Sequence, residues 1–141
     1  MVKSYYLHNM NRGGMRPPSN FVEAIQHCFK KYATFHGRAT RLEYKSFWRF
    51  FWGGNILPYI FLIVTDDMEP IILLFSLFFS LFNIVTILPL VAVSTRRLHD
   101  IGKSGWWQLI YLLPFGMFYG VYLSITEGEG DNEYGKDPES L

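Results

Sequence analysis

Three long runs without a charged side chain constrain this sequence more than any other feature. They extend over residues 50–65, 70–95 and 104–126. A helix that crosses a bilayer needs about 20 mostly apolar residues at a rise of about 1.5 Å per residue. The first run reaches this length only when Arg49 lies inside the helix, where its long side chain can extend to the headgroups. We therefore predict an all-α polytopic membrane protein with three transmembrane helices, at about 45–65, 70–94 and 105–126.

A soluble protein with very apolar core helices is the alternative, and the pattern of residues 71–82 opposes it. A helix at a protein surface keeps a polar face, yet Ser76 and Ser80 are the only polar residues in this segment, and its four phenylalanines point in every direction. Aromatic side chains also lie near the ends of the runs, as in the interfacial belts of membrane proteins. These are Trp48, Trp52, Tyr59, Trp106 and Trp107.

Basic and acidic islands alternate along the chain and predict its orientation. The segment before the first run and residues 96–103 are basic, whereas residues 66–69 and the tail are acidic. The positive-inside rule then places the N-terminus in the cytoplasm, residues 66–69 outside, residues 96–103 inside and the C-terminus in the periplasm. One alternative remains open. Pro114, Phe115 and Gly116 would break the third run into a re-entrant hairpin that returns the tail to the cytoplasm.

The predicted membrane domain covers residues 19–126, between a disordered polar leader (1–18) and a polar acidic tail (127–141). Within it, residues 20–35 read as an amphipathic helix, capped by Ser19 or Asn20 and with Glu23 in its first turn. Such a helix lies in the membrane interface or packs on the loops of its own protein. The tail is rich in turn-forming residues, but its ordered motif around Asn132 suggests that it docks on the protein.

Two basic motifs fall at the same predicted membrane face and form the candidate binding site. Its residues are Arg38, Arg41, Lys45, Arg96, Arg97 and Lys103. Arg41, Lys45 and Arg49 lie one helical turn apart on one face, where like charges repel. These bases therefore need an anionic partner, such as phospholipid headgroups or another protein. Glu43 and Asp100 are the only acids nearby, so we expect uncompensated positive charge. Four polar residues are assigned structural roles: Glu43, His99, Asp100 and Asn132. The alternative is that the bases only signal topology.

Catalytic, metal and transport signals are weak. Side chains with suitable chemistry are Cys28, His36, Glu43, His99 and Asp100, but no His-x-x-x-His, Cys-x-x-Cys or Gly-x-Ser-x-Gly pattern is present. We therefore expect no enzyme, metal or cofactor. The expected partners are the lipid bilayer, anionic headgroups, and a second copy or another membrane protein, but no nucleic acid. The alternatives are a subunit of an oligomeric channel or transporter, and a lipid-modifying enzyme that uses His99 and Asp100.

Three motifs in a fixed order resemble a known family. They are Phe35-His36-Gly37-Arg38-Ala39-Thr40-Arg41-Leu42-Glu43-Tyr44, then Arg96-Arg97-Leu98-His99-Asp100 with Ser104-Gly105-Trp106-Trp107, and finally Gly128 to Asn132 with Tyr134-Gly135 and Asp137-Pro138. The sequence is similar to the YhaH-like bacterial inner membrane proteins, the family of domain of unknown function 805. The match extends over roughly residues 27–138. This resemblance implies a multi-pass bacterial inner membrane protein and no particular activity.

Overall fold

The described part of the chain is entirely helical apart from turns and loops. The structure, a computed structural model, describes residues 16–64 and 69–140. Their helices are α2 (Phe21–Lys30), α3 (Arg41–Val64), α4 (Glu69–Asp100), the 3₁₀ helix η1 (Gly105–Leu112) and α5 (Gly116–Ile125). Most of the predicted leader and the acidic loop at 66–68 lie outside the described residues, so those predictions stay predictions.

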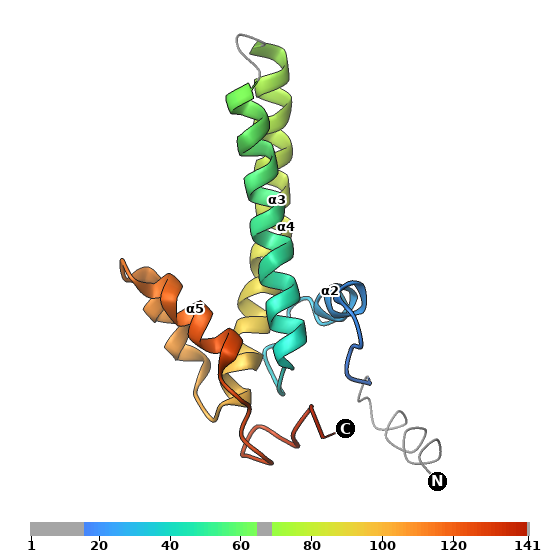
Figure 1. The fold of residues 1–141 in the computed structure, drawn as a ribbon, viewed down its shortest axis with the longest axis vertical. Coiled ribbons are helices and arrows are strands. Elements are labelled where there is room, and N and C mark those ends of the chain that lie inside the picture. Colours follow the sequence, from blue (N-terminus) through green and yellow to red (C-terminus); the bar gives the residue numbers. More distant parts are fainter. Residues whose placement is uncertain (1–15, 65–68, 141) are drawn as a thin grey trace.

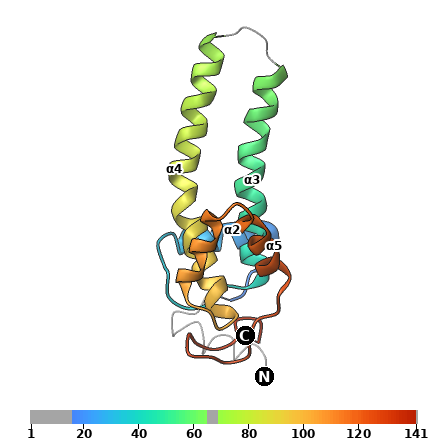
Figure 2. The ribbon, with the colours of Figure 1, turned by 90° about the vertical axis from the view of Figure 1, so that its left-hand side faces the viewer.

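Helices α3 and α4 form a long antiparallel hairpin that projects from the rest of the protein (Figures 1 and 2). Asn83 Nδ2 of α4 donates a hydrogen bond to Asn55 Oδ1 of α3 at 3.0 Å, which links the two helices midway along the hairpin. In the described residues, Pro70–Asp100 is the one helix that is both long and apolar enough to cross a membrane. Only 6% of its most apolar 18-residue stretch is buried. A core helix of a soluble protein would instead be covered.

A reciprocal pair of hydrogen bonds starts α3. Glu43 N donates to Thr40 Oγ1 at 3.1 Å, and Thr40 N donates to Glu43 Oε2 at 2.9 Å. This arrangement is a capping box, which satisfies two backbone donors that the first helical turn leaves without partners. It fixes where the hairpin begins. We call the end of the hairpin at Arg41 of α3 and Asp100 of α4 the hairpin base.

Helix α2 packs beside the hairpin base. Asn20 caps it by accepting a hydrogen bond from Glu23 N at 2.9 Å, but the helix ends at Lys30, five residues earlier than predicted. The ring of Phe29 makes edge contacts with Phe47 and Phe50 of α3, at centroid distances of 5.5 and 5.9 Å. The helix therefore packs on the protein itself, through an aromatic contact with α3.

The third uncharged run does not form one helix, so the prediction of a continuous helix over 105–126 is wrong. The chain reverses between η1 and α5, as Figure 2 shows. Pro114 forces the preceding residue, Leu113, into extended backbone (φ −81°, ψ 151°) and offers no N–H to a helix. Gly116 is buried, and a Cβ there would lie 2.6 Å from the Cα of Tyr111. A glycine therefore allows the two arms of this reversal to touch.

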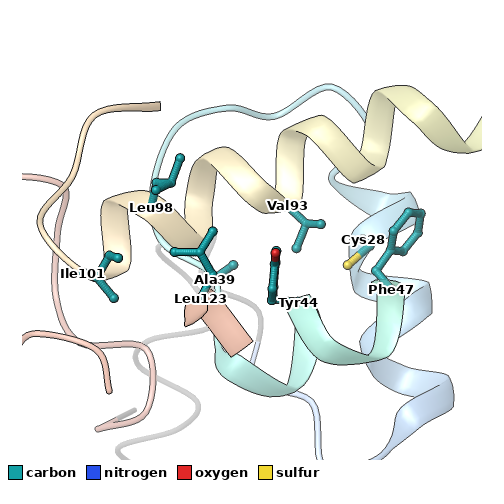
Figure 3. Packing of buried hydrophobic residues seen from close by; sticks show 8 residues of the cluster. All are labelled: Cys28, Ala39, Tyr44, Phe47, Val93, Leu98, Ile101 and Leu123. Atoms are coloured by element: carbon teal, nitrogen blue, oxygen red, sulfur yellow. The ribbon is translucent and has the colours of Figure 1, made fainter. Parts of the chain in front are cut away.

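A small apolar core ties these elements together at the hairpin base (Figure 3). Its members are Cys28, Ala39, Tyr44, Phe47, Val93, Leu98, Ile101 and Leu123. The hydroxyls of Tyr44 and Tyr111 lie 2.9 Å apart, which joins α3 to η1. Helices α2, α3, α4, η1 and α5 and the loop before α3 thus meet at one end of the hairpin. The packing at this end fixes the positions of the polar side chains that lie there.

Candidate functional site

Arg38 and Asp100 form a buried ion pair at the hairpin base. Arg38 Nη2 lies 2.8 Å from Asp100 Oδ1, and the two side chains are 2% and 0% exposed. Arg38 Nη1 also donates to the carbonyls of Gly130 and Gly135, at 2.7 and 3.1 Å, and Nη2 donates to the carbonyl of Glu129. All three guanidinium nitrogens of Arg38 therefore have protein acceptors.

Arg97 completes this arrangement from the same helix as Asp100. Its Nη1 pairs with Asp100 Oδ2, and its Nε donates to the carbonyl of Leu123 at 3.0 Å. Its Nη2 donates to the carbonyl of Thr126. These two carbonyls end α5, where the helix dipole favours a cation. Arg38, Arg97 and Asp100, which we call the arginine–aspartate cluster, thus join the loop before α3, the end of α4 and the end of α5.

The tail docks on the hairpin base through the third motif. Asn132 Nδ2 donates a hydrogen bond to the carbonyl of His99 at 2.9 Å. The ring of Tyr134 stacks on the ring of His99, with a centroid distance of 4.0 Å and an angle of 3° between the ring planes. A Cβ at Gly128 would lie 2.5 Å from Asp100 Oδ2, so a side chain there would collide with the buried carboxylate. The tail therefore does not lie beyond a third span, and the side of the bilayer on which it ends stays a prediction. The reversal at Pro114 brings the tail back to the same end.

Docking of the tail also supplies acidic partners that the sequence argument placed elsewhere. Arg41 Nη2 lies 2.8 Å from Glu139 Oε2, and Arg41 Nη1 lies 3.7 Å from Glu127 Oε1. The Arg41 hydrogen bond lowers the pKa of the Glu139 carboxyl below its usual value of 4.5. The tail thus supplies counter-charge for Arg41, one of the six bases of the predicted site.

The remaining predicted bases have no contact with the arginine–aspartate cluster among the residues described. Lys103 Nζ lies 4.6 Å from the centroid of the Trp107 ring, a cation–π contact. Arg96 is buried, and its Nη1 and Nη2 have no hydrogen-bond partner in residues 16–64 or 69–140. Lys45 is partly exposed on α3. The structure therefore brings together Arg38, Arg97 and Asp100 but leaves Lys45, Arg96 and Lys103 in separate environments.

Glu43 connects α2 to α3 in addition to its role in the capping box. Its Oε1 lies 3.5 Å from His27 Nδ1 and 3.9 Å from Lys31 Nζ. The sequence argument missed the capping box, although Thr40-Arg41-Leu42-Glu43 carries its signature, a Thr followed three residues later by Glu. Nearby, burial raises the pKa of the Cys28 thiol to about 12. This thiol stays protonated and is a poor nucleophile.

His99 and Asp100 are adjacent in sequence, but their side chains have different partners. His99 Nδ1 lies 3.1 Å from the carbonyl of Gly37. The carboxylate of Asp100 binds Arg38 and Arg97 instead. An aspartate that orients a histidine for proton transfer would hydrogen-bond to its ring nitrogen, and these two side chains make no such bond in the described structure.

A cavity of about 1030 Å³ opens between α4, η1 and the loop before α3. Val91, Leu109 and Leu112 contribute to its apolar wall, and His36, His99 and Ser104 contribute polar groups. Such a mixture, mostly apolar with a few polar side chains, is typical of sites for small amphipathic molecules. No sequence pattern indicates this cavity, because it forms only where the turn at Gly102 brings η1 alongside α4.

Comparisons with known proteins agree with the membrane character of the fold. A family model described as "Protein of unknown function (DUF805)" matches residues 32–136. Inner membrane protein YhaI of Escherichia coli (strain K12) is 37% identical over 115 residues, which cover 77% of this chain and 89% of the relative. Inner membrane protein YhaH of the same strain is 34% identical over 119 residues, which cover 77% and 90%. No solved structure matches.

Proposed function

The chain belongs to the DUF805 family, and from this premise we propose that it is a non-enzymatic protein of the bacterial inner membrane that binds phospholipid beside a two-pass hairpin. The observation that carries the proposal is the cavity between α4, η1 and the loop before α3. Its position at the hairpin base puts it beside the membrane surface once the hairpin spans the bilayer.

The lengths of the helices favour two crossings over three. Helix α4 is long and apolar enough to cross a membrane by itself. Helix α3 has 24 residues, and we propose that its apolar part after Arg49 crosses beside α4, with the Arg49 side chain extended to the headgroups. Helix η1 has 8 residues and α5 has 10, so neither arm reaches across. The hairpin base and the tail then share one side. The basic residues at this end make it cytoplasmic under the positive-inside rule.

The reversal formed by η1 and α5 is suited to the cytoplasmic leaflet. Trp106, Leu112 and Phe115 are 78%, 82% and 77% exposed. Large apolar surface of this kind marks contact with a membrane or a partner, and a shallow position in the headgroup and acyl boundary would cover it. One wall of the cavity then borders lipid directly, so a phospholipid acyl chain is its natural occupant.

The polar side chains of the cavity fit the other part of a phospholipid. An acyl chain would contact Val91, Leu109 and Leu112, while headgroup oxygens would accept hydrogen bonds from Ser104 and His36. A lipid-modifying reaction at His99 would need a partner group, and the carboxylate of Asp100 is already bound by two arginines. We therefore propose that the cavity binds phospholipid and does not modify it.

Native mass spectrometry of the protein, extracted in mild detergent, tests the proposal. Val91→Trp places an indole in the cavity, and Ile84→Trp places the same group on an exposed site of α4 that does not line it. We expect wild type and Ile84→Trp to retain phospholipid, and Val91→Trp to retain several-fold less while keeping the same thermal unfolding temperature. Equal retention by all three proteins would show that the cavity does not bind lipid.

A further inference from the structure

Lys45 and Arg49 are neighbouring bases on the surface of α3 that have no counter-charge among the described residues. They lie four residues apart, one turn of α3, and neither side chain makes a hydrogen bond or ion pair with any residue that the structure describes. Two like charges at this spacing repel each other. The neighbouring Arg41, by contrast, is paired with Glu139 at 2.8 Å.

These two bases share a depression with aromatic side chains. Lys45, Arg49, Trp48, Trp52 and Ser124 line a hollow of about 280 Å³ between α3 and α5. The indole N–H of Trp48 is buried and has no acceptor among residues 16–64 and 69–140. The depression thus offers two cations, and an unused hydrogen-bond donor lies on one of its lining residues. This combination suits an oxyanion.

The same face of α3 becomes apolar further along the helix. Trp52 is followed at helical spacing by Ile56, Ile60 and Ile63, and all four side chains are exposed. This row of exposed apolar side chains extends along α3 away from the hairpin base, which is toward the middle of the membrane in the proposed topology. A ligand that matches it has an anionic head of about the size of the depression and an aliphatic chain beyond it.

We propose that Lys45 and Arg49 bind the headgroup phosphate of an anionic phospholipid whose acyl chain lies along Ile56, Ile60 and Ile63. The proposal rests on the two-pass topology of the proposed function, but not on the cavity beside η1. The phosphate offsets the repulsion between the two bases. A zwitterionic lipid would bring its own ammonium group close to them, so a lipid with net negative charge is preferred.

Headgroup preference in nanodiscs tests this site. The double variant Lys45→Gln/Arg49→Gln removes both charges, and Lys30→Gln/Lys136→Gln removes two exposed bases away from the depression. Native mass spectrometry then measures the ratio of phosphatidylglycerol to phosphatidylethanolamine retained from equal mixtures. We expect the first variant to lose roughly tenfold or more of the preference for phosphatidylglycerol, because two charges near the surface are removed. The second variant should keep the wild-type ratio.

The same experiment separates this site from the cavity. Val91→Trp should lower the total amount of retained lipid without changing the headgroup ratio, whereas Lys45→Gln/Arg49→Gln should change the ratio. A wild-type ratio in a Lys45→Gln/Arg49→Gln protein with unchanged circular dichroism would overturn the headgroup site. It would leave the cavity proposal intact. If both double variants lost the preference for phosphatidylglycerol, the proposed headgroup site would also be wrong, because the preference would then depend on the overall charge of the protein.

Discussion

Arg38 Nη2 lies 2.8 Å from Asp100 Oδ1, although the two residues are 62 positions apart, and both side chains are buried. The other oxygen of the same carboxylate binds Arg97. Through these contacts one aspartate holds the loop before α3, the end of α4 and, by way of Arg38, the backbone of the tail. The acidic tail is therefore part of the folded protein and docks at the same end of the hairpin as Arg38.

Asp100→Asn should destabilise the protein severely. The substitution leaves two buried guanidinium groups without a counter-charge, and breaking a buried ion pair from one side costs about 3–5 kcal/mol. Thermal unfolding in detergent measures the change. Glu133→Gln is the matched control, because Glu133 is exposed in the same region, and it should change stability by at most about 0.5 kcal/mol. Similar losses in both variants would mean that the buried pairs contribute no more than surface charge.

Arg38→Lys should release the tail while leaving the charge unchanged. Lysine has one ammonium group and cannot reproduce the forked donors that reach Asp100, Gly130 and Gly135 together. We expect faster amide hydrogen exchange across residues 129–135. Arg41→Lys, at a more exposed ion pair, should affect only the region around Glu139. Slow exchange across residues 129–135 in Arg38→Lys would show that other contacts hold the tail.

The end of the tail should detach at acid pH. The hydrogen bond from Arg41 lowers the pKa of Glu139 below 4.5, so its ion pair stabilises docking fully above 4.5 and is lost as the pH falls through the lowered value. Hydrogen exchange at residues 137–140, measured as a function of pH and corrected for intrinsic rates, should show this loss. In Glu139→Gln the same segment should exchange rapidly at neutral pH, with no further acid-induced step. An acid step of wild-type size in that variant would point to another group.

Gly116→Ala should disturb the reversal between η1 and α5. A Cβ at this position overlaps backbone atoms of Ile110 and Tyr111. Backbone atoms cannot move aside as the end of a flexible side chain can. We expect a loss of about 1–3 kcal/mol, as for other overpacked sites, measured by thermal unfolding in detergent. Gly53→Ala is the control, since a Cβ there meets nothing within 4 Å in the described structure. A Gly116→Ala protein as stable as Gly53→Ala would mean that the two arms are not in close contact.

The hairpin and the pairing of Asp100 with an arginine could be predicted from the sequence, because both follow from local features. Helices α3 and α4 contain the first two uncharged runs and extend beyond them into the charged residues at the hairpin base. Asp100 stands three residues after Arg97, a spacing that brings side chains together on a helix. The capping box of Thr40 and Glu43 also has a sequence signature, a Thr followed three residues later by Glu, although Glu43 was assigned only as a charged residue near the bases.

The sequence offered the reversal only as an alternative, at Pro114, Phe115 and Gly116, and it did not indicate the partners of the tail. The length of the third run favoured a span, and the effect of Pro114 became decisive only with Gly116 allowing close packing of η1 on α5. The acceptors of Arg38 in the tail are backbone carbonyls, which every residue carries, so no side-chain pattern indicates them. With the tail expected beyond a third span, its acids could not be recognised as partners of Arg41.

The side of the membrane that holds the C-terminus is the most direct measure of this account. Green fluorescent protein and alkaline phosphatase can each be fused after Leu141, with a fusion truncated after Val64 as the control for a single crossing. The two-pass hairpin with a docked tail predicts a fluorescent, phosphatase-negative fusion at Leu141 and a phosphatase-positive fusion at Val64. A phosphatase-positive, non-fluorescent fusion at Leu141 would contradict it, because the tail could not then reach Arg38 at the cytoplasmic hairpin base.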